Sequence, residues 1–286
     1  MKNIKDCNIG IVGLGLMGGA VALALRERCG VSQARLFACD KDGETLAAAK
    51  SKELICEGWG ADRAGQMLAK CDVVFLCLNP SAIISFLGKW ESAFKTGALV
   101  TDIAGTKSSI ALAAEKLRED IDFIPGHPMA GAEKGGFANS ALCDFKGKNY
   151  IITPLPRNKP ENLRFLEALV RSMGFGRITE VTPAEHDAKI AFTSQLCHVI
   201  ASALIDCEAD TTITRFGGGS FEDLTRIAML NVPMWTEIFI ENRSALLSRV
   251  EQFEKSLDEL KLLIGGAKAE DLGKRLEIVR DRRTAM

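Results

Sequence analysis

A stretch near the middle of the chain holds a histidine whose surroundings suit acid–base chemistry. His127 stands in Phe123-Ile-Pro-Gly-His-Pro-Met-Ala-Gly131 and is one of only three histidines among 286 residues. The apolar residues 121–124 predict a strand, and Pro125 and Pro128 predict a stiff loop after it. Open α/β sheets bind their ligands outside the carboxyl ends of the strands. Because imidazole exchanges protons near neutral pH, His127 is the candidate catalytic residue.

The other two histidines lie on one predicted helix. His186 and His198 are twelve residues apart, which is more than three helical turns. They therefore cannot bind one metal ion as an i,i+4 pair could, and we expect no metal site. Ser194 and His198 are four residues apart and share a helix face. Arg226 adds a cation on a later helix, after the glycine run 217–219.

A glycine-rich turn near the N-terminus has the spacing of a dinucleotide-binding site. Residues 8–12 predict a strand and residues 19–27 a helix, and between them stands Gly13-Leu14-Gly15-Leu16-Met17-Gly18. The first glycine allows the tight turn and the second lets a pyrophosphate approach the backbone. The third lets the helix pack close to the strand. All six residues are candidate cofactor-binding residues.

The end of the next predicted strand, residues 35–39, indicates which dinucleotide is bound. Asp40 follows that strand, 22 residues after Gly18. A carboxylate at this place hydrogen-bonds the ribose hydroxyls of NAD and repels the 2′-phosphate of NADP. Lys41 is a neighbouring cation that would favour the phosphate instead. We predict NAD as the cofactor and include both Asp40 and Lys41 in its site.

The elements that position these residues alternate between strand and helix up to residue 181. Further apolar runs predict strands at 72–78, 98–101, 121–124, 150–153 and 176–181, with helices between them. The alternation predicts an α/β fold with a Rossmann-type, doubly wound and mostly parallel sheet. We expect Thr106 or Ser108 to cap the helix predicted for residues 108–119.

From Thr182 onward the sequence predicts helices alone. Thr182 and Glu185 form a capping box, with Pro183 at the first helical position. A long helix is expected for residues 237–264, because its apolar residues recur every three or four positions and form a stripe. Such a stripe packs against another helix, in this subunit or in a partner, and we predict a homodimer. The polar residues 267–286 are expected to fray.

These patterns divide the chain into two domains. Residues 1–181 are predicted to form an NAD-binding Rossmann domain, and residues 182–286 an all-helical domain for substrate binding and dimerisation.

Composition excludes several classes of partner. The net charge of −1 gives no electrostatic basis for binding nucleic acid or an acidic membrane surface. The chain has nine cysteines without a Cys-x-x-Cys pair, which favours reduced thiols in a cytoplasmic protein. The N-terminal residues run directly into a strand, so no signal peptide is expected. No uninterrupted apolar run reaches the length of about 18 residues expected of a membrane span.

Four motifs, in this order, resemble the prephenate/arogenate dehydrogenase family of tyrosine biosynthesis. They are the glycine-rich turn, Gly126-His-Pro-Met-Ala-Gly131, His186-Asp187 with Ser194 and His198 downstream, and Asp223-x-Thr-Arg-Ile-Ala228 before Met234-Trp235. The resemblance covers nearly the whole chain. It implies NAD-dependent oxidative decarboxylation of prephenate to 4-hydroxyphenylpyruvate, in a cleft between a Rossmann domain and a helical dimerisation domain.

The reaction that the resemblance implies suits the candidate residues. Neutral His127 is expected to accept the proton of the C4 hydroxyl of prephenate. Arg226 is expected to clamp a carboxylate, since a guanidinium binds such a group bidentately. His198, with Ser194, is expected to form a second contact with the substrate. We assign His186 to structure.

Two departures from the family pattern accompany the resemblance. The serine of the family's Asp-x-Gly-Ser-x-Lys motif is Gly105 here, and Thr106 is the candidate replacement for its hydroxyl. The family's Ser-His-Leu-Pro-His motif is Ser194-Gln-Leu-Cys-His198, which keeps the last histidine.

Three alternatives to prephenate oxidation stay open. The substrate could be L-arogenate, which differs only by an amino group in place of the keto group. A β-hydroxyacid dehydrogenase would share the glycine-rich turn. The catalytic Lys-x-x-x-Asn motif of that class is absent, because the corresponding stretch, Lys189-Ile-Ala-Phe-Thr193, lacks the asparagine. A non-catalytic NAD-binding sensor would use the same fold without turnover.

Overall fold

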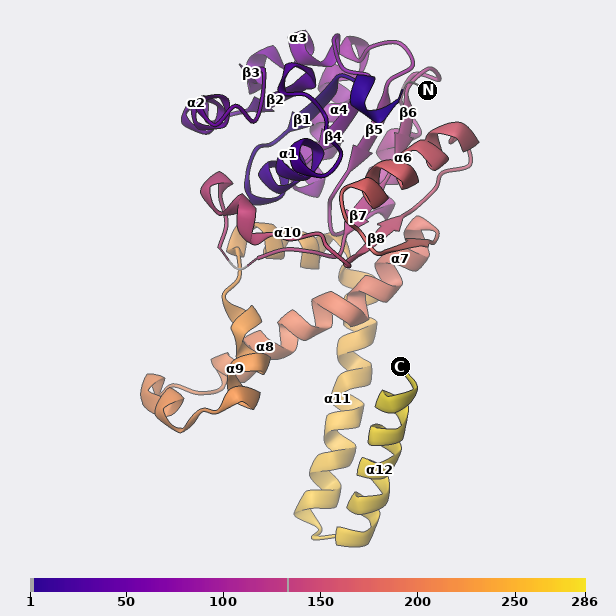
Figure 1. Cartoon of the computed structure of the whole chain (residues 1–286). Helices are drawn as coiled ribbons and strands as arrows, with labels where there is room; N and C mark the ends of the chain where they lie inside the picture. Colours follow the sequence, from indigo (N-terminus) through magenta and orange to yellow (C-terminus); the bar gives the residue numbers. More distant parts are fainter. Residues whose placement is uncertain (1–2, 133) are drawn as a thin grey trace.

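A parallel sheet organises the N-terminal half of the computed structural model, which describes residues 3–132 and 134–286. Within those ranges, six parallel strands pair in the order β3-β2-β1-β4-β5-β6 (Figure 1). The strands are β1 (Ile9–Val12), β2 (Leu36–Asp40), β3 (Glu57–Gly60), β4 (Val73–Leu76), β5 (Leu99–Asp102) and β6 (Asp122–Ile124). The strand order reverses between β1 and β4, which is where doubly wound sheets bind ligands. This confirms the Rossmann-type prediction.

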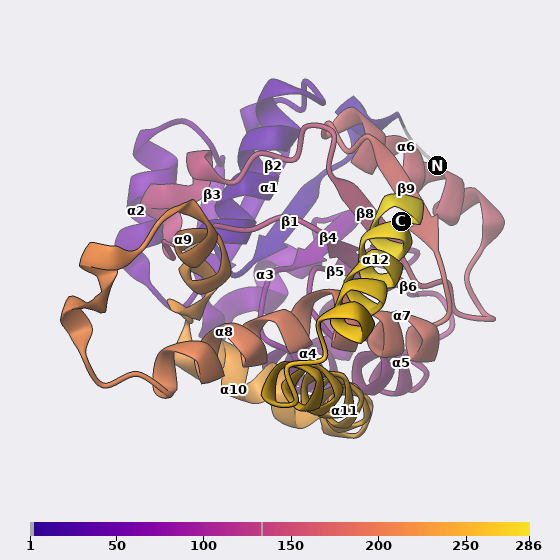
Figure 2. The same ribbon diagram turned by 90° about the horizontal axis from the view of Figure 1, so that it is seen from below.

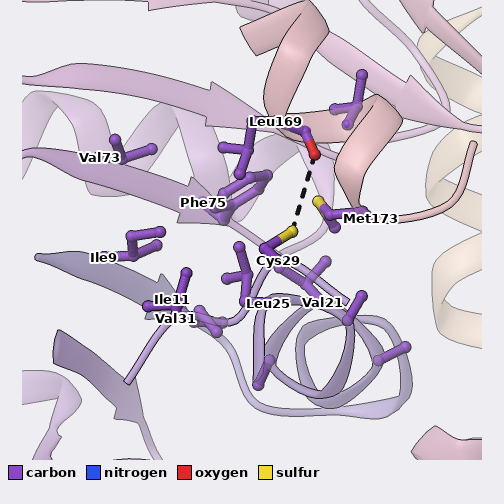
Figure 3. Packing of buried hydrophobic residues seen from close by; sticks show 14 of the residues in the cluster. Ile9, Ile11, Val21, Leu25, Cys29, Val31, Val73, Phe75, Leu169 and Met173 are labelled. Carbon is purple, nitrogen blue, oxygen red and sulfur yellow. Dashed lines mark hydrogen bonds between the residues drawn. The ribbon is translucent and has the colours of Figure 1, made fainter. Parts of the chain in front are cut away.

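Helices cover both faces of this sheet. They are α1 (Leu16–Glu27), α2 (Gly43–Ser51), α3 (Ala64–Leu68), α4 (Pro80–Trp90), α5 (Ser108–Ala114) and α6 (Pro160–Ser172). Alternate strand residues point to opposite faces. Ile9 and Phe75 therefore join the core against α1 and α6, while Val12 and Val74 join the core against α3, α4 and α5. Figure 3 shows the first core, where Cys29 Sγ lies 3.9 Å from the Leu169 carbonyl oxygen.

A second, smaller sheet follows β6. In the described part of the chain it has three strands, β7 (Gly126–Pro128), β8 (Asn149–Ile152) and β9 (Arg177–Glu180). The prediction of one sheet continuing to residue 181 was therefore wrong for these last strands. Pro125 has no N–H to donate and separates β6 from β7, which pairs antiparallel with β8. His127 thus lies in a short strand opposite Ile151, and not in a loop as predicted.

The C-terminal half is helical in its described residues. Its helices are α7 (Pro183–Ile190), α8 (Leu196–Asp206), α9 (Gly219–Thr225), α10 (Val232–Glu241), α11 (Arg243–Gly265) and α12 (Ala269–Ala285). Thr182 Oγ1 accepts from the Glu185 N–H at 3.2 Å, which confirms the predicted cap of α7. A π-helical turn, Ala191–Gln195, joins α7 to α8. Short 3-10 turns complete the chain, at Ile4–Asp6, Gln33–Arg35, Ala61–Arg63, Glu91–Ala93, Phe137–Leu142, Thr211–Phe216 and Arg226–Ala228.

Two helix predictions in this half were wrong. The expected single helix 237–264 is divided at Asn242, whose buried side chain donates to the Asp187 carbonyl at 2.9 Å and to Gln195 Oε1 at 2.8 Å. α10 and α11 meet at this residue and run in different directions (Figure 1). The tail expected to fray forms α12, which folds back along α11, and the pair projects away from the sheet (Figures 1 and 2).

The helical segment Pro183–Asp206 combines length and apolar composition in a way that would also allow it to cross a membrane. Its most apolar 18-residue window has a mean hydropathy of 1.4. Here the segment contacts α5 near its start and α9 and α11 further along. It also carries three of the candidate site residues, His186, Ser194 and His198. Within the single chain only 28% of that window is buried, so these contacts account for only part of its apolar composition.

Candidate active site

The glycine-rich turn between β1 and α1 has the shape that its spacing predicts. Gly13 has a φ of +87°, and a Cβ there would lie 2.5 Å from the Cys77 carbonyl oxygen. A Cβ on Gly18 would lie 1.9 Å from the Gly13 carbonyl oxygen, so helix and turn pack too closely for a side chain. Gly15 is exposed, and no heavy atom of the described chain lies within 4 Å of its Cβ position. A pyrophosphate can therefore approach the backbone at Gly15.

The residues between these glycines differ in their surroundings. Leu14 is buried in the core, whereas Leu16 and Met17 form the half-buried first turn of α1. The N–H groups of a first helical turn have no partner within the helix, and they favour an anion. The structure thus fits the cofactor site predicted for residues 13–18, with Leu14 in a packing role.

Asp40 ends β2 beside this turn. Its Oδ2 accepts from the Leu14 N–H at 2.5 Å and its Oδ1 accepts from the Asp42 N–H at 2.9 Å. The carboxylate is therefore fixed at the carboxyl edge of the sheet, and its remaining lone pairs are free to accept from ribose hydroxyls. Lys41 is exposed next to it. This position suits the role predicted for Asp40.

His127 contacts a second histidine that lies 59 residues later in the sequence. His127 Nδ1 is 2.9 Å from His186 Nε2, and the two rings meet edge to face with centroids 5.1 Å apart. His127 is half-buried, whereas His186 is 1% exposed. The assignment of His186 to structure alone is thus incomplete, because this side chain directly contacts the candidate base.

Asp187 completes a chain of three side chains. His186 Nδ1 is 2.8 Å from Asp187 Oδ1. The same carboxylate accepts from the backbone N–H of Lys107 at 2.8 Å and of Ser108 at 2.9 Å. Asp187 therefore occupies the N-terminus of α5, and the helical half of the chain contacts the Rossmann half through this residue.

The predicted capping of α5 by its own hydroxyl residues was wrong. The helix begins after Lys107 and has no side-chain cap from that residue. Thr106 is buried, and its Oγ1 has no hydrogen-bond partner among the described residues. A buried Thr106 is also poorly placed to replace the serine hydroxyl that the family motif has at Gly105.

A buried ion pair lies beneath the histidines. Lys107 Nζ bonds Asp102 Oδ2, and both side chains are fully buried. Asp102 Oδ1 also accepts from the Gly126 N–H at 3.2 Å, and Oδ2 from the Ala104 N–H at 2.9 Å. Asp102 thus links the end of β5 to the residue before His127. Burial lowers the pKa of Lys107, which the Asp102 carboxylate opposes.

These surroundings favour neutral histidines. Burial holds the pKa of His127 well below its ordinary value of 6.5, and repulsion from His186 and Lys107 lowers it further. Burial also lowers the pKa of His186, although Asp187 opposes the shift. Burial raises the pKa of Asp187, but hydrogen bonds from His186 and Ser108 outweigh it and leave the pKa below its ordinary value. At neutral pH we therefore expect His127 and His186 to be neutral imidazoles and Asp187 to be an ionised carboxylate.

A second group of candidate residues lies further along the same helical segment. His198 Nδ1 is 2.9 Å from the Ser194 carbonyl oxygen, and the His198 ring stacks on Trp235 with centroids 3.6 Å apart. Burial lowers the pKa of His198, and the positive charge of Arg226 adds to this effect. The Nδ1 contact to a carbonyl fixes the proton on that nitrogen, so His198 Nε2 is an acceptor. Arg226 itself is exposed, on the turn that follows α9.

The predicted catalytic and substrate-binding residues thus form two groups at different places along the helical segment Pro183–Asp206. One group surrounds His186 and the other surrounds His198. His186 and His198 are separated by roughly 18 Å along the axis, at 1.5 Å per residue. The π-turn lies between them and sets the relative direction of their side chains. Asp187 and Trp235 were not among the predicted site residues, although both lie inside the quoted motifs. The sequence feature that could have identified Asp187 is its position directly after His186.

Both halves of the chain match family models. The nucleotide-binding domain model of prephenate dehydrogenase matches residues 21–179, and the prephenate dehydrogenase dimerization domain model matches residues 182–278. The prephenate dehydrogenase of Bacillus subtilis (strain 168) is 27% identical over 296 residues, which cover 100% of this chain and 77% of the relative.

Solved structures of related enzymes superpose on nearly the full length of this chain. Prephenate dehydrogenase from A. aeolicus, in complex with hydroxyphenyl propionate and NAD+, superposes with a TM-score of 0.87 at 29% identity, covering 99% of each chain. Synechocystis arogenate dehydrogenase gives a TM-score of 0.78 at 30% identity, covering 96% of this chain and 98% of that one. With a Rossmann half that carries the glycine-rich turn and a helical half matching the dimerization domain, the chain belongs to the prephenate dehydrogenase family.

Proposed function

We propose that this protein catalyses the NAD-dependent oxidative decarboxylation of prephenate to 4-hydroxyphenylpyruvate. The observation that carries the proposal is the 2.9 Å contact between His127 Nδ1 and His186 Nε2. Burial lowers the pKa of His127 and favours its neutral form. Its Nε2 is then the nitrogen that can accept the proton of the C4 hydroxyl group. The A. aeolicus relative with hydroxyphenyl propionate and NAD+ supports a substrate of this shape.

NAD fits the residues at the β1–α1 turn. The open backbone at Gly15 and the first turn of α1 would hold the pyrophosphate, and Asp40 would hold the ribose hydroxyls. When bound there, NAD supplies the nicotinamide ring that accepts the hydride from C4. Loss of the C1 carboxylate as CO₂ leaves its bonding electron pair in the ring, which becomes an aromatic phenolate. The phenolate oxygen takes the proton back from His127 and becomes the hydroxyl of 4-hydroxyphenylpyruvate. The chain itself contributes orientation and proton acceptance.

His198, Ser194 and Arg226 are proposed to hold the acidic groups of the substrate. Prephenate carries two carboxylates, whereas the chain as a whole is nearly neutral, so local cations and hydrogen-bond donors must recognise it. Arg226 lies near enough to His198 to influence the pKa of that ring. A guanidinium binds a carboxylate through two parallel hydrogen bonds.

The assembly is proposed to be a homodimer formed through the helical half. All exposed large apolar side chains in the described residues, apart from Leu112 and Leu142, lie after residue 182. Soluble monomers rarely expose so much apolar surface on one part of the molecule. The match to a dimerization domain supports this proposal.

The domain boundary and the location are also proposals. The change from sheet to helices at Thr182 supports domains of residues 1–181 and 182–286. Nine cysteines without a disulfide among the described residues support a reducing, cytoplasmic location.

The main alternative substrate is L-arogenate, which the Synechocystis relative oxidises according to its name. Following NADH absorbance with prephenate and then with L-arogenate separates the two. We expect kcat/KM to be higher for prephenate. A higher value for L-arogenate would assign the enzyme to arogenate, and no NADH with either would leave the β-hydroxyacid dehydrogenase or NAD-sensor alternatives.

A further inference from the structure

We propose that Asp187, acting through His186, determines which nitrogen of His127 carries the proton, and so makes His127 a base. This inference rests on the proposed function of His127. It assigns Asp187 and His186 as positioning residues, since neither is proposed to touch the substrate. The evidence is the continuous contact from His127 Nδ1 to His186 Nε2 and from His186 Nδ1 to Asp187 Oδ1.

The direction of the hydrogen bonds follows from the carboxylate. An ionised carboxylate only accepts, so His186 Nδ1 must carry a proton and donate it to Asp187. A neutral imidazole has one N–H, and His186 Nε2 is therefore an acceptor. His127 Nδ1 must then donate to it, which leaves the lone pair of His127 on Nε2. The chain of contacts thus permits one arrangement of protons when both rings are neutral.

Asp187 is held firmly enough to impose this order. It accepts from the backbone N–H groups of Lys107 and Ser108, and the partial positive charge at the N-terminus of α5 favours its ionised form. Lys107 and Asp102 are the other charged groups near the two rings, and they bond each other. The described contacts thus leave Asp187 as the carboxylate that orients His186.

The same series of hydrogen bonds, from His127 through His186 to Asp187, stabilises His127 after His127 takes up the proton. His127 would then donate from both nitrogens, and its Nδ1–H would stay bonded to His186. His186 keeps its own bond to Asp187, so the new positive charge lies two hydrogen bonds from a fixed negative charge. A carboxylate placed behind a catalytic histidine has this effect in several unrelated enzymes.

Replacing Asp187 with asparagine tests the order of the protons. An amide nitrogen of Asp187→Asn at the Oδ1 position would donate to His186 Nδ1, place the His186 proton on Nε2 and reverse the His127 tautomer. An amide nitrogen at the Oδ2 position would face the Ser108 N–H and keep the tautomer, so the nitrogen NMR described below is measured on this variant too. The matched control is Glu185→Gln, an exposed carboxylate two residues earlier on α7. We expect kcat to fall by about 10²–10⁴-fold in Asp187→Asn and less than twofold in the control, with KM for NAD within twofold in both.

A second pair of variants covers the case in which Asp187→Asn fails to fold because α5 loses its cap. The amide of His186→Gln can accept from His127 and donate to Asp187, whereas His186→Leu can do neither. His186→Gln is expected to retain at least tenfold more kcat than His186→Leu. Equal activity of the two would overturn the proposal. So would more than a third of wild-type kcat in a folded Asp187→Asn whose His127 proton has moved to Nε2.

Nitrogen NMR gives a readout that does not depend on turnover. With only three histidines in the chain, ¹⁵N-labelled imidazoles can be assigned with a His127→Asn variant. We expect the full-length wild-type protein to carry the His127 proton on Nδ1. A proton on Nε2 would overturn the inference even in an active enzyme. The Nδ1 form in a protein inactive on prephenate and L-arogenate would support the relay and reject the proposed reaction.

Discussion

Glu237 Oε1 accepts a hydrogen bond from the backbone N–H of Ser81 at 2.6 Å, although the two residues are 156 positions apart. Ser81 lies in the first turn of α4, so the carboxylate of α10 meets the positive end of a Rossmann helix. Asp187 makes the same type of contact with α5. Two carboxylates from the helical half therefore hold it against the ends of two neighbouring helices.

Removing the contact between Glu237 and Ser81 should weaken the packing of the helical half against the Rossmann half. Glu237→Ala is expected to lower stability by about 1 kcal/mol, because a partly exposed charged hydrogen bond is lost. For a chain of this size we expect Tm to fall by roughly 2–4 °C. Glu241→Ala, an exposed carboxylate on the same helix, is the control. Equal Tm values in the two variants by calorimetry would contradict a joining role for Glu237.

Substituting the candidate base should affect turnover far more than cofactor binding. His127→Asn is expected to lower kcat by roughly 10²–10⁴-fold with little change in the Kd for NAD. Stopped-flow or steady-state NADH absorbance measures the first, and fluorescence titration the second. A variant that keeps more than a third of wild-type kcat would rule out His127 as the base.

The pH dependence should reflect a depressed histidine pKa. An unperturbed imidazole would lose activity as pH falls through about 6.5. Because burial lowers the pKa of His127, its neutral form persists below that pH, and kcat should decline only at more acidic values. The unfolded chain binds the proton first, so stability should also decrease as pH falls below about 6.5. A half-maximal kcat at pH 6.5 or above would contradict this assignment.

Cofactor choice should depend on Asp40. Asp40→Ser is expected to raise KM for NAD and to reduce the discrimination against NADP, because the charge that repels a 2′-phosphate is gone. Lys41→Ala is the comparison, since it removes the neighbouring cation and should leave the NAD preference intact. If the unmodified protein already prefers NADP, Lys41 is the dominant group and the prediction is wrong.

Arg226 should contribute to substrate affinity alone. A charge-assisted hydrogen bond contributes about 1.5–3 kcal/mol, so Arg226→Ala should raise KM for prephenate by roughly ten- to a hundredfold. The KM for NAD should stay within about a factor of two. Arg226→Lys should recover part of the loss, because an ammonium cannot form the planar fork. Arg280→Ala, on exposed α12, is the control, and an equal KM in the two alanine variants would refute the role.

The dimer should form through the helical half. Light scattering at micromolar concentration is expected to give about twice the chain mass of 31.0 kDa. Leu257→Glu, on α11, should shift the protein toward monomer, whereas Leu112→Glu in the Rossmann half should not. Both leucines are exposed in the single chain, at 52% and 63%. A wild-type protein that scatters as a monomer would exclude the assembly.

Local patterns in the sequence predicted the turn at Gly13–Gly18 and the carboxylate at Asp40, because neighbouring residues determine both features. His127 was also identified from its immediate surroundings. The partners of His127 could not be found in this way, since His186 lies 59 residues later and Asp187 caps a helix 79–80 residues earlier. Hydrogen bonds over such separations leave no periodic pattern. The break at Asn242 was missed for the same reason, because its side chain bonds to Asp187 and Gln195.

The π-helical turn at Ala191–Gln195 has a consequence for how this region can change during evolution. It holds one residue more per turn than its α-helical neighbours, so a single deletion there would convert it to regular α-helix. Every side chain beyond it would then rotate by roughly 100° relative to His186, at 3.6 residues per turn. The His198 ring would then lose its stacking contact with Trp235, although neither residue had been substituted. Substitutions at the exposed Phe192 and Thr193 should therefore be tolerated more readily than changes in the length of the turn.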